Sequence, residues 1–86
     1  MKLSYDLFIR YEVYQILQRV GSSDLERVSN FMEALAGDPF RKGDATTLDE
    51  HGRDVQVKML GRLALFYWVD HAEKEVRVVD LANASE

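Results

Sequence analysis

The longest unbroken apolar run of this chain, from Leu63 to Val69, constrains the fold more than any other feature. It is far shorter than the stretch of about 20 apolar residues that a membrane-spanning helix needs. Because the run is apolar on both faces, it predicts a strand in the middle of a sheet, with cover on each side. Gly61, just before the run, predicts a tight reversal into it from a preceding strand.

The segments on either side of this run predict its neighbouring strands. Val55, Val57 and Met59 alternate with polar residues, which is the pattern of a strand with one wet face, and these three side chains are expected to face the core. Val76 to Leu81 predict a last strand, and Ala45 to Asp49 predict a brief one. This part of the chain is therefore expected to form a sheet with hairpin connections.

The N-terminal part of the chain predicts one short strand and two helices. Residues 2–9 alternate imperfectly and predict the strand. From Arg10 onward apolar residues recur at helical spacing, and Gly21 is expected to end this helix in the left-handed conformation. Ser23-Asp24-Leu25-Glu26 is a capping-box pattern that predicts the start of a second helix. Gly37-Asp38-Pro39 predicts its end.

These elements predict an α+β fold in the order β-α-α-β-β-β, with one further short strand. The helices, joined by a short turn, are expected to form a helical hairpin packed on one face of a small, largely antiparallel sheet. At 86 residues the chain is expected to be a single domain over residues 1–86, because two cores would each bury too little surface.

Composition narrows the function classes. The net charge of -4 argues against a general nucleic-acid binder, because affinity for phosphate backbones comes mainly from Lys and Arg. The absence of cysteine excludes disulfides and thiolate chemistry. The first residues lack the apolar stretch and cleavage site of a secretory signal, so a cytoplasmic protein with no membrane association is expected.

The common catalytic motifs are absent from the sequence. No serine has the pattern of a nucleophile elbow, and no glycine-rich phosphate loop precedes a helix. His51 and His71 each lie near carboxylates in predicted turns, but neither stretch has an established ligand spacing. We therefore expect no metal and no cofactor.

What remains is a set of cations on or next to the predicted strands, namely Arg53, Lys58, Arg62 and Arg77. The two-residue period predicts that Lys58 and Arg77, together with Gln56, lie on the sheet face opposite the helices. There the two cations would hold phosphate groups of a nucleic acid or acidic side chains of a partner. The alternative is that they are exposed strand residues that discourage edge-to-edge aggregation.

The sheet face opposite the helices is also expected to carry apolar side chains. The central strand places either Ala64, Phe66 and Trp68 or Leu65 and Tyr67 there. A small two-layer domain usually buries such residues in a partner, a dimer mate or a binding groove. A protein partner is therefore favoured over a lone monomer.

Three stretches, which together cover nearly the whole chain, resemble the RelE/ParE toxin superfamily. Residues 31–40, Phe-Met-Glu-Ala-Leu-Ala-Gly-Asp-Pro-Phe, are similar to the family's second helix, which ends in Leu-x-x-x-Pro. Gly43-Asp44 with residues 49–53 resembles a variable loop followed by a Gly-Arg pair that leads into the sheet. Residues 57–79 resemble the family's paired strands with a Gly turn, a following tyrosine and a Val-rich last strand.

This resemblance implies the toxin component of a bacterial type II toxin–antitoxin, or plasmid stabilisation, system that inhibits growth. Toxins of this superfamily either cleave messenger RNA in the ribosome or, in the ParE branch, poison DNA gyrase. A cognate antitoxin wraps the toxin with an extended or helical segment. The implied partners are thus an antitoxin and either gyrase or the ribosome with its mRNA.

The residues of the family's RNA-cleaving branch are only partly present. Its pair of lysines, two apart on one strand, corresponds to Gln56 and Lys58, and its arginine position falls on Ala64, close to Arg62. Residues 82–86 hold neither the arginine nor the tyrosine of the family's tail. The resemblance implies Lys58, Arg62 and Arg77 as an incomplete catalytic set, and Arg53, Gln56, Phe66 and Trp68 as contacts for a partner or nucleic acid.

Three hypotheses follow. The leading one is a toxin of this superfamily that acts through protein binding more than through RNA cleavage, because a general base and several cations of the reaction are missing. The second is a ribosome-dependent mRNA endoribonuclease that uses Lys58, Arg62 and Arg77 as phosphate clamps. The third is a non-toxic interaction module of the same fold that forms a homodimer through its sheet face.

Overall fold

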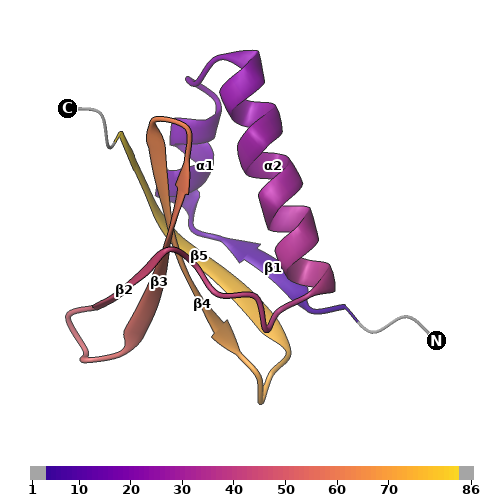
Figure 1. The fold of residues 1–86 in the computed structure, drawn as a ribbon, viewed down its shortest axis with the longest axis vertical. Helices are drawn as coiled ribbons and strands as arrows, with labels where there is room; N and C mark the ends of the chain where they lie inside the picture. Colours follow the sequence, from indigo (N-terminus) through magenta and orange to yellow (C-terminus); the bar gives the residue numbers. More distant parts are fainter. Residues whose placement is uncertain (1–3, 84–86) are drawn as a thin grey trace.

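Two helices pack on one face of a five-stranded sheet in a computed structural model of the chain, which describes residues 4–83 (Figure 1). The strand order is β1-β5-β4-β3-β2, with β1 parallel to β5 and the other neighbours antiparallel. The predicted α+β class is confirmed. The elements are β1 Asp6–Ile9, α1 Tyr11–Leu17, α2 Ser22–Gly37, β2 Ala45–Leu48, β3 Asp54–Leu60, β4 Leu63–Asp70 and β5 Glu75–Asn83.

The strand built from the long apolar run, β4, lies in the middle of the sheet between β5 and β3, as predicted. Its alternate residues Leu63, Leu65 and Tyr67 are buried against the helices and form part of one hydrophobic cluster. Phe66 and Trp68 point to the other face, which neither helix of residues 4–83 covers, and are half-buried. We call this second surface the open face.

The helices supply the other half of the core. α1 and α2 run in opposite directions on the same side of the sheet (Figure 1). The core side chains of the helices recur at helical spacing because only one stripe of each helix meets the sheet. These side chains are Val13 and Leu17 from α1, and Val28, Phe31, Met32 and Leu35 from α2. Neither helix is long and apolar enough to cross a membrane.

The link between the helices differs from the sequence prediction. Gly21 has φ -67°, so the chain does not use a left-handed residue there, and Gly21 is itself the N-cap of α2. Because α2 begins at Ser22, Ser23 lies inside the first turn, where its hydroxyl cannot act as an N-cap. The predicted capping box is therefore wrong, and among residues 4–83 no side chain makes the cap hydrogen bond.

The prediction of which β3 residues face the helices is also wrong. Leu60 pairs with Leu63 across the Gly61 turn, and Lys58 pairs with Leu65. Directly paired residues on neighbouring strands share a face. Because Leu63 and Leu65 enter the core, Lys58 lies on the helix side.

The same register places Gln56 on the helix side, opposite Tyr67, and it places Val57 and Met59 on the open face. The alternation of β3 alone favours the reverse orientation, but the two-residue turn ties β3 to β4. Burial of Leu63, Leu65 and Tyr67 in the core then decides the orientation of β3.

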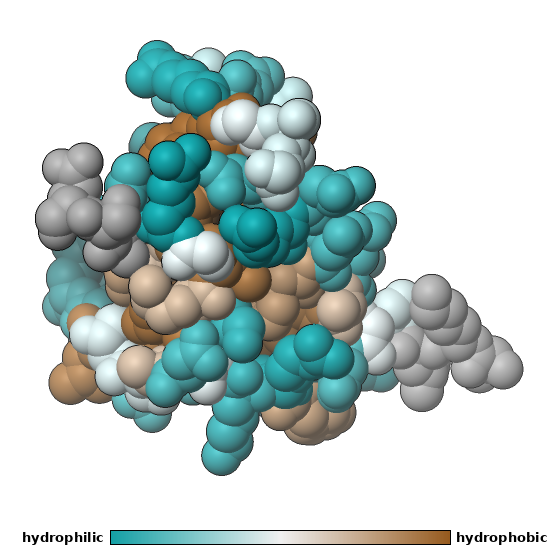
Figure 2. Space-filling view, turned by 45° about the horizontal axis from the view of Figure 1, so that its top comes forward, coloured by the Kyte–Doolittle hydropathy of each residue, from teal (hydrophilic) through white to brown (hydrophobic). Residues whose placement is uncertain are grey.

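Seen from the front and above, apolar side chains show between polar ones across the middle of the molecule (Figure 2).

Candidate functional site

The open face is hollowed. The hollow has a volume of about 950 Å³, and its lining comes from β1 and the start of α1, from β3, β4 and β5, and from β2 with the β2–β3 turn. Figure 1 shows this turn projecting away from the helices at the lower left. The apolar residues of the lining include Phe8, Val55, Phe66 and Trp68.

A row of alternating aromatic rings and guanidinium groups crosses this hollow. Phe8 on β1 pairs in register with Arg77 on β5, which pairs with Trp68 on β4. The Arg77 Cζ atom lies 5.1 Å from the Phe8 ring centroid and 5.9 Å from that of Trp68. The Arg53 Cζ atom lies 4.0 Å from the Trp68 centroid. We call these four residues the aromatic–arginine row, which is stabilised by cation–π attraction.

The β2–β3 turn positions Arg53 at the end of the row. Asp49 organises this turn, because its Oδ1 atom accepts hydrogen bonds from the backbone N–H groups of His51 at 2.8 Å and Arg53 at 2.9 Å. The hydrogen bond from Arg53 N–H, and then that from His51, holds the pKa of Asp49 below its usual value. Gly52 has φ 78°, a left-handed conformation that glycine adopts without steric cost.

Both arginines of the row are already paired. The Arg53 Nη1 atom lies 3.7 Å from Asp49 Oδ2, and Arg77 Nη2 donates to Glu75 Oε1. A guanidinium that stacks on a ring still exposes part of its edge, and each of these two side chains is about half exposed. The two arginines of the row are therefore partly neutralised and are not free cations.

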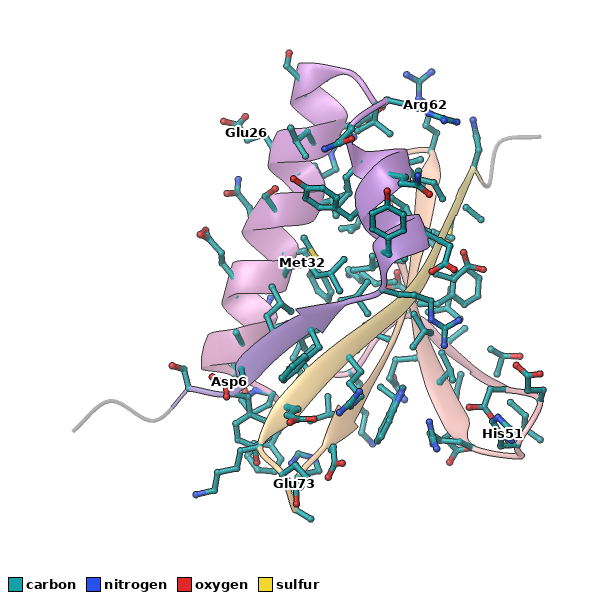
Figure 3. All side chains as sticks on the ribbon, turned by 180° about the vertical axis from the view of Figure 1, so that it is seen from behind. Asp6, Glu26, Met32, His51, Arg62 and Glu73 are labelled. Atoms are coloured by element: carbon teal, nitrogen blue, oxygen red, sulfur yellow. The ribbon has the colours of Figure 1, made fainter. Side chains whose placement is uncertain are left out.

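Arg62, the nearest candidate for the family's arginine, is engaged with a helix. Its Nε and Nη2 atoms both donate to Asp24 Oδ2 at 3.2 Å, while Arg27 Nη1 donates to Asp24 Oδ1 at 3.2 Å. The Asp24 side chain is only 10% exposed, so this carboxylate joins the start of α2 to the β3–β4 turn. Figure 3 shows Arg62 and His51 at opposite ends of the molecule.

Lys58 is held on the helix side of the sheet. Its Nζ atom lies 3.4 Å from Asp44 Oδ1 and 5.8 Å from the Phe31 ring centroid. Asp44 Oδ2 accepts the Met59 backbone N–H at 2.7 Å, and this hydrogen bond, followed by the contact with Lys58, lowers the pKa of Asp44. Gln56 accepts the Gly43 backbone N–H at 2.8 Å. Both side chains thus fasten the connector that precedes β2.

The structure does not bring the three predicted catalytic residues together. The prediction that Lys58 and Arg77 share a face is wrong, because Lys58 pairs with Leu65 and Arg77 with Trp68, whose side chains point to opposite faces. Arg62 lies at the turn and binds Asp24. Their catalytic role remains a prediction.

Three of the four predicted contact residues do meet. Arg53, Phe66 and Trp68 all line the hollow, whereas Gln56 lies on the other face. Sequence reasoning missed Phe8, because the imperfect alternation of residues 2–9 gave no sign of which side chains face outward. The pairing of a short N-terminal strand with β5 was the missing information.

Two further titratable side chains, His71 and Tyr67, make structural contacts. His71 Nδ1 lies 3.0 Å from the Tyr5 hydroxyl, and its ring stacks on Phe40 with centroids 4.7 Å apart. Burial raises the pKa of Tyr67, whose hydroxyl donates to the Arg41 carbonyl at 3.4 Å. Between residues 4 and 83 no group of three or more His, Asp or Glu side chains is arranged to hold a metal ion.

Several solved structures have a backbone arrangement similar to that of this chain. One chain of the archaeal RelE–RelB complex from Pyrococcus horikoshii matches with a TM-score of 0.81 at 18% identity, over 98% of this chain and 99% of that chain. The isolated E. coli RelE toxin matches with a TM-score of 0.77 at 18% identity, over 96% of this chain and 87% of that chain.

A chain of the toxin–antitoxin complex RelBE2 from Mycobacterium tuberculosis matches with a TM-score of 0.76 at 18% identity, over 94% of this chain and 99% of that chain. No family model and no curated protein sequence matches this chain. The likeness therefore lies in the arrangement of the backbone. The chain has the RelE toxin fold over nearly its whole length.

Proposed function

We propose that this chain is the toxin component of a type II toxin–antitoxin system, that it acts in the cytoplasm mainly by binding a protein, and that a cognate antitoxin neutralises it. The observation that carries the proposal is the near-complete match to the RelE fold, with a TM-score of 0.81 over 98% of the chain. A fold alone does not fix a function, so the residues of the site must support the choice.

The distribution of cations supports protein binding over RNA cleavage. Lys58, Arg62 and Arg77 lie apart, and each has a carboxylate partner. The open-face positions Val57 and Met59 of β3 carry no charge. Cleavage of a phosphodiester needs several groups that converge on one phosphate, and such convergence is not found among these cations. The net charge of -4 opposes attraction of a polyanion.

The proposal is tested by induced expression in a bacterial host. We expect growth arrest, and we expect co-expression of the small open reading frame adjacent to the gene to reverse it. Co-purification of that gene product with the chain identifies the antitoxin, and assays of gyrase and of translation in the arrested cells identify the target. If induction causes no arrest and no partner co-purifies, the proposal fails and the non-toxic dimeric module is favoured, which sedimentation then tests.

The endoribonuclease alternative is tested by Lys58→Ala combined with Arg62→Ala. Under our proposal the double variant still arrests growth, and cleavage of mRNA during translation is absent from both proteins. Arg19→Ala, which removes an exposed charge outside the site, is the control, and circular dichroism verifies that each variant is folded. Translation-dependent cleavage by the unmodified chain that disappears in the double variant favours the ribonuclease instead.

A further inference from the structure

The hollow on the open face combines exposed apolar side chains with charged ones. Phe8 is 45% exposed and Leu48 65% exposed, although both line a concave surface beside the half-buried Trp68. Exposed aromatic and aliphatic side chains that gather in a concavity usually receive an apolar group of a partner. Single hydrophobic residues scattered over a flat surface are common and would not indicate a binding site.

The charged side chains that line the hollow carry more negative than positive charge. Arg53 and Arg77 are paired with Asp49 and Glu75, as described above. The other charged side chains of the lining have no ion-pair partner in the part of the chain that the structure describes, and they are Arg10, Glu12, Glu50 and Asp80. Three unpaired carboxylates against one unpaired guanidinium give the hollow an excess of negative charge.

We infer that the hollow binds an extended polypeptide segment of a protein partner, with an apolar side chain against the aromatic–arginine row and Lys or Arg side chains beside Glu12, Glu50 and Asp80. This inference deepens the proposed function and rests on it, because it specifies the chemistry of the segment that the partner presents. Electrostatic complementarity of this kind selects the partner and speeds its association more than it strengthens the complex.

The same charges disfavour two other kinds of ligand, a nucleic acid and an acidic peptide. A nucleic acid would bring phosphates against the unpaired carboxylates, while both arginines of the row already have carboxylate partners. An acidic peptide would meet the same repulsion.

The size of the molecule sets the length of segment to test. A segment in strand conformation rises about 3.3 Å per residue, so about 10 residues cross the 32 Å dimension of the molecule.

Trp68 is the only tryptophan of the chain and lies in the hollow, so its fluorescence reports binding directly. We suggest titrating the full chain at low salt with three synthetic peptides of equal length that alternate Leu with Lys, with Gln or with Glu. A single-stranded adenine RNA of comparable length is the fourth probe. We expect the Lys peptide to bind at least about fivefold more tightly than the Glu peptide, with the Gln peptide between them.

Matched variants assign this preference to the hollow. Glu50→Gln with Asp80→Asn removes two of the unpaired carboxylates, and the asparagine keeps an oxygen for the Leu81 N–H that Asp80 accepts at 2.8 Å. We expect the ratio of Glu-peptide to Lys-peptide dissociation constants to fall below about twofold. Glu26→Gln with Glu33→Gln changes the net charge equally on exposed positions of α2 and should leave the ratio unchanged.

The inference is overturned if the Glu peptide or the RNA binds more tightly than the Lys peptide, if all probes bind equally, or if none changes the Trp68 emission. It is also overturned if the α2 control lowers the ratio as much as the hollow variant does. These outcomes are independent of growth arrest. A chain that arrests growth but prefers the Glu peptide keeps the proposed function and loses this inference.

Discussion

The two faces of the sheet differ in how fully they bury the side chains of β4. On the helix side, Leu65 and Tyr67 of β4 are 0% exposed and contribute to the one large hydrophobic cluster. On the open face, Phe66 and Trp68 alternate with them, yet both are only half-buried, and Arg53 and Arg77 lie over the Trp68 ring. The helix side contributes most of the stability, because it buries the larger share of the apolar area of the sheet.

The open face keeps its aromatic side chains accessible and in fixed positions. Guanidinium groups cover a ring without removing it from reach, since they are planar and remain partly hydrated. An apolar strand in a small protein such as this one therefore does not have to lie between two layers of the same chain. One side of β4 has no second layer over it within residues 4–83.

The largest difference in stability between the two faces is expected when two adjacent residues of β4 are each replaced by alanine. Leu65→Ala should lower the free energy of unfolding by about 2–5 kcal/mol, because it leaves a cavity in the closed core. Phe66→Ala removes more atoms but from a half-buried position, and should cost about 1–2 kcal/mol. Urea denaturation of the two variants measures both values. Equal losses would mean that the open face is as much a core as the helix side.

A smaller effect is expected at the junction of α2 and the β3–β4 turn. Asp24→Asn keeps the shape of the side chain but weakens its hydrogen bonds to Arg27 and Arg62, at a cost of about 1–3 kcal/mol. Asp38→Asn is the control, since the exposed pair of Asp38 with Arg41 at 4.0 Å should contribute less than about 1 kcal/mol. Thermal unfolding compares the two. If Asp24→Asn costs no more than the control, Arg62 is free to serve another role.

The smallest effect is expected in the pH dependence of stability. The Met59 N–H and then Lys58 lower the pKa of Asp44 in the folded chain, so this carboxylate contributes stability above its ordinary pKa of 3.8. That contribution is lost as pH falls through the lowered folded pKa. Asp44→Asn should therefore flatten the acid side of the stability curve below pH 3.8, measured by urea unfolding at each pH. Glu26→Gln, on an exposed position of α2, is the control. On the acid side, the free energy of unfolding of this variant should depend more steeply on pH than that of Asp44→Asn.

Most of the fold was predictable because its signals are local. The Gly61 and Gly52 turns, the helical stripes and the end of α2 at Gly37 each follow from a few neighbouring residues. The start of α2 was predicted two residues late, because the Ser23-Glu26 pattern suits a cap but the chain folds with Gly21 in that position. A capping pattern states a preference that the packing of the helix can override.

The candidate site was predictable only in part. Arg53, Phe66 and Trp68 were named from the sequence and meet in the hollow, while Phe8 and the carboxylates Glu50 and Asp80 were not. The residues that share this surface come from separate strands. Their proximity depends on the pairing of β1 with β5 and on the register of β4 with β5, which local patterns do not encode.

By itself the sequence determined that β4 is central, that two amphipathic helices need one sheet face, and that the last three strands are joined by hairpins. Each of these follows from periodicity and turn chemistry within a short segment. Only the tertiary structure decided which face each cation occupies. A one-residue choice of register reverses every side chain of a strand, and the burial of Leu65 and Tyr67 made that choice for Lys58.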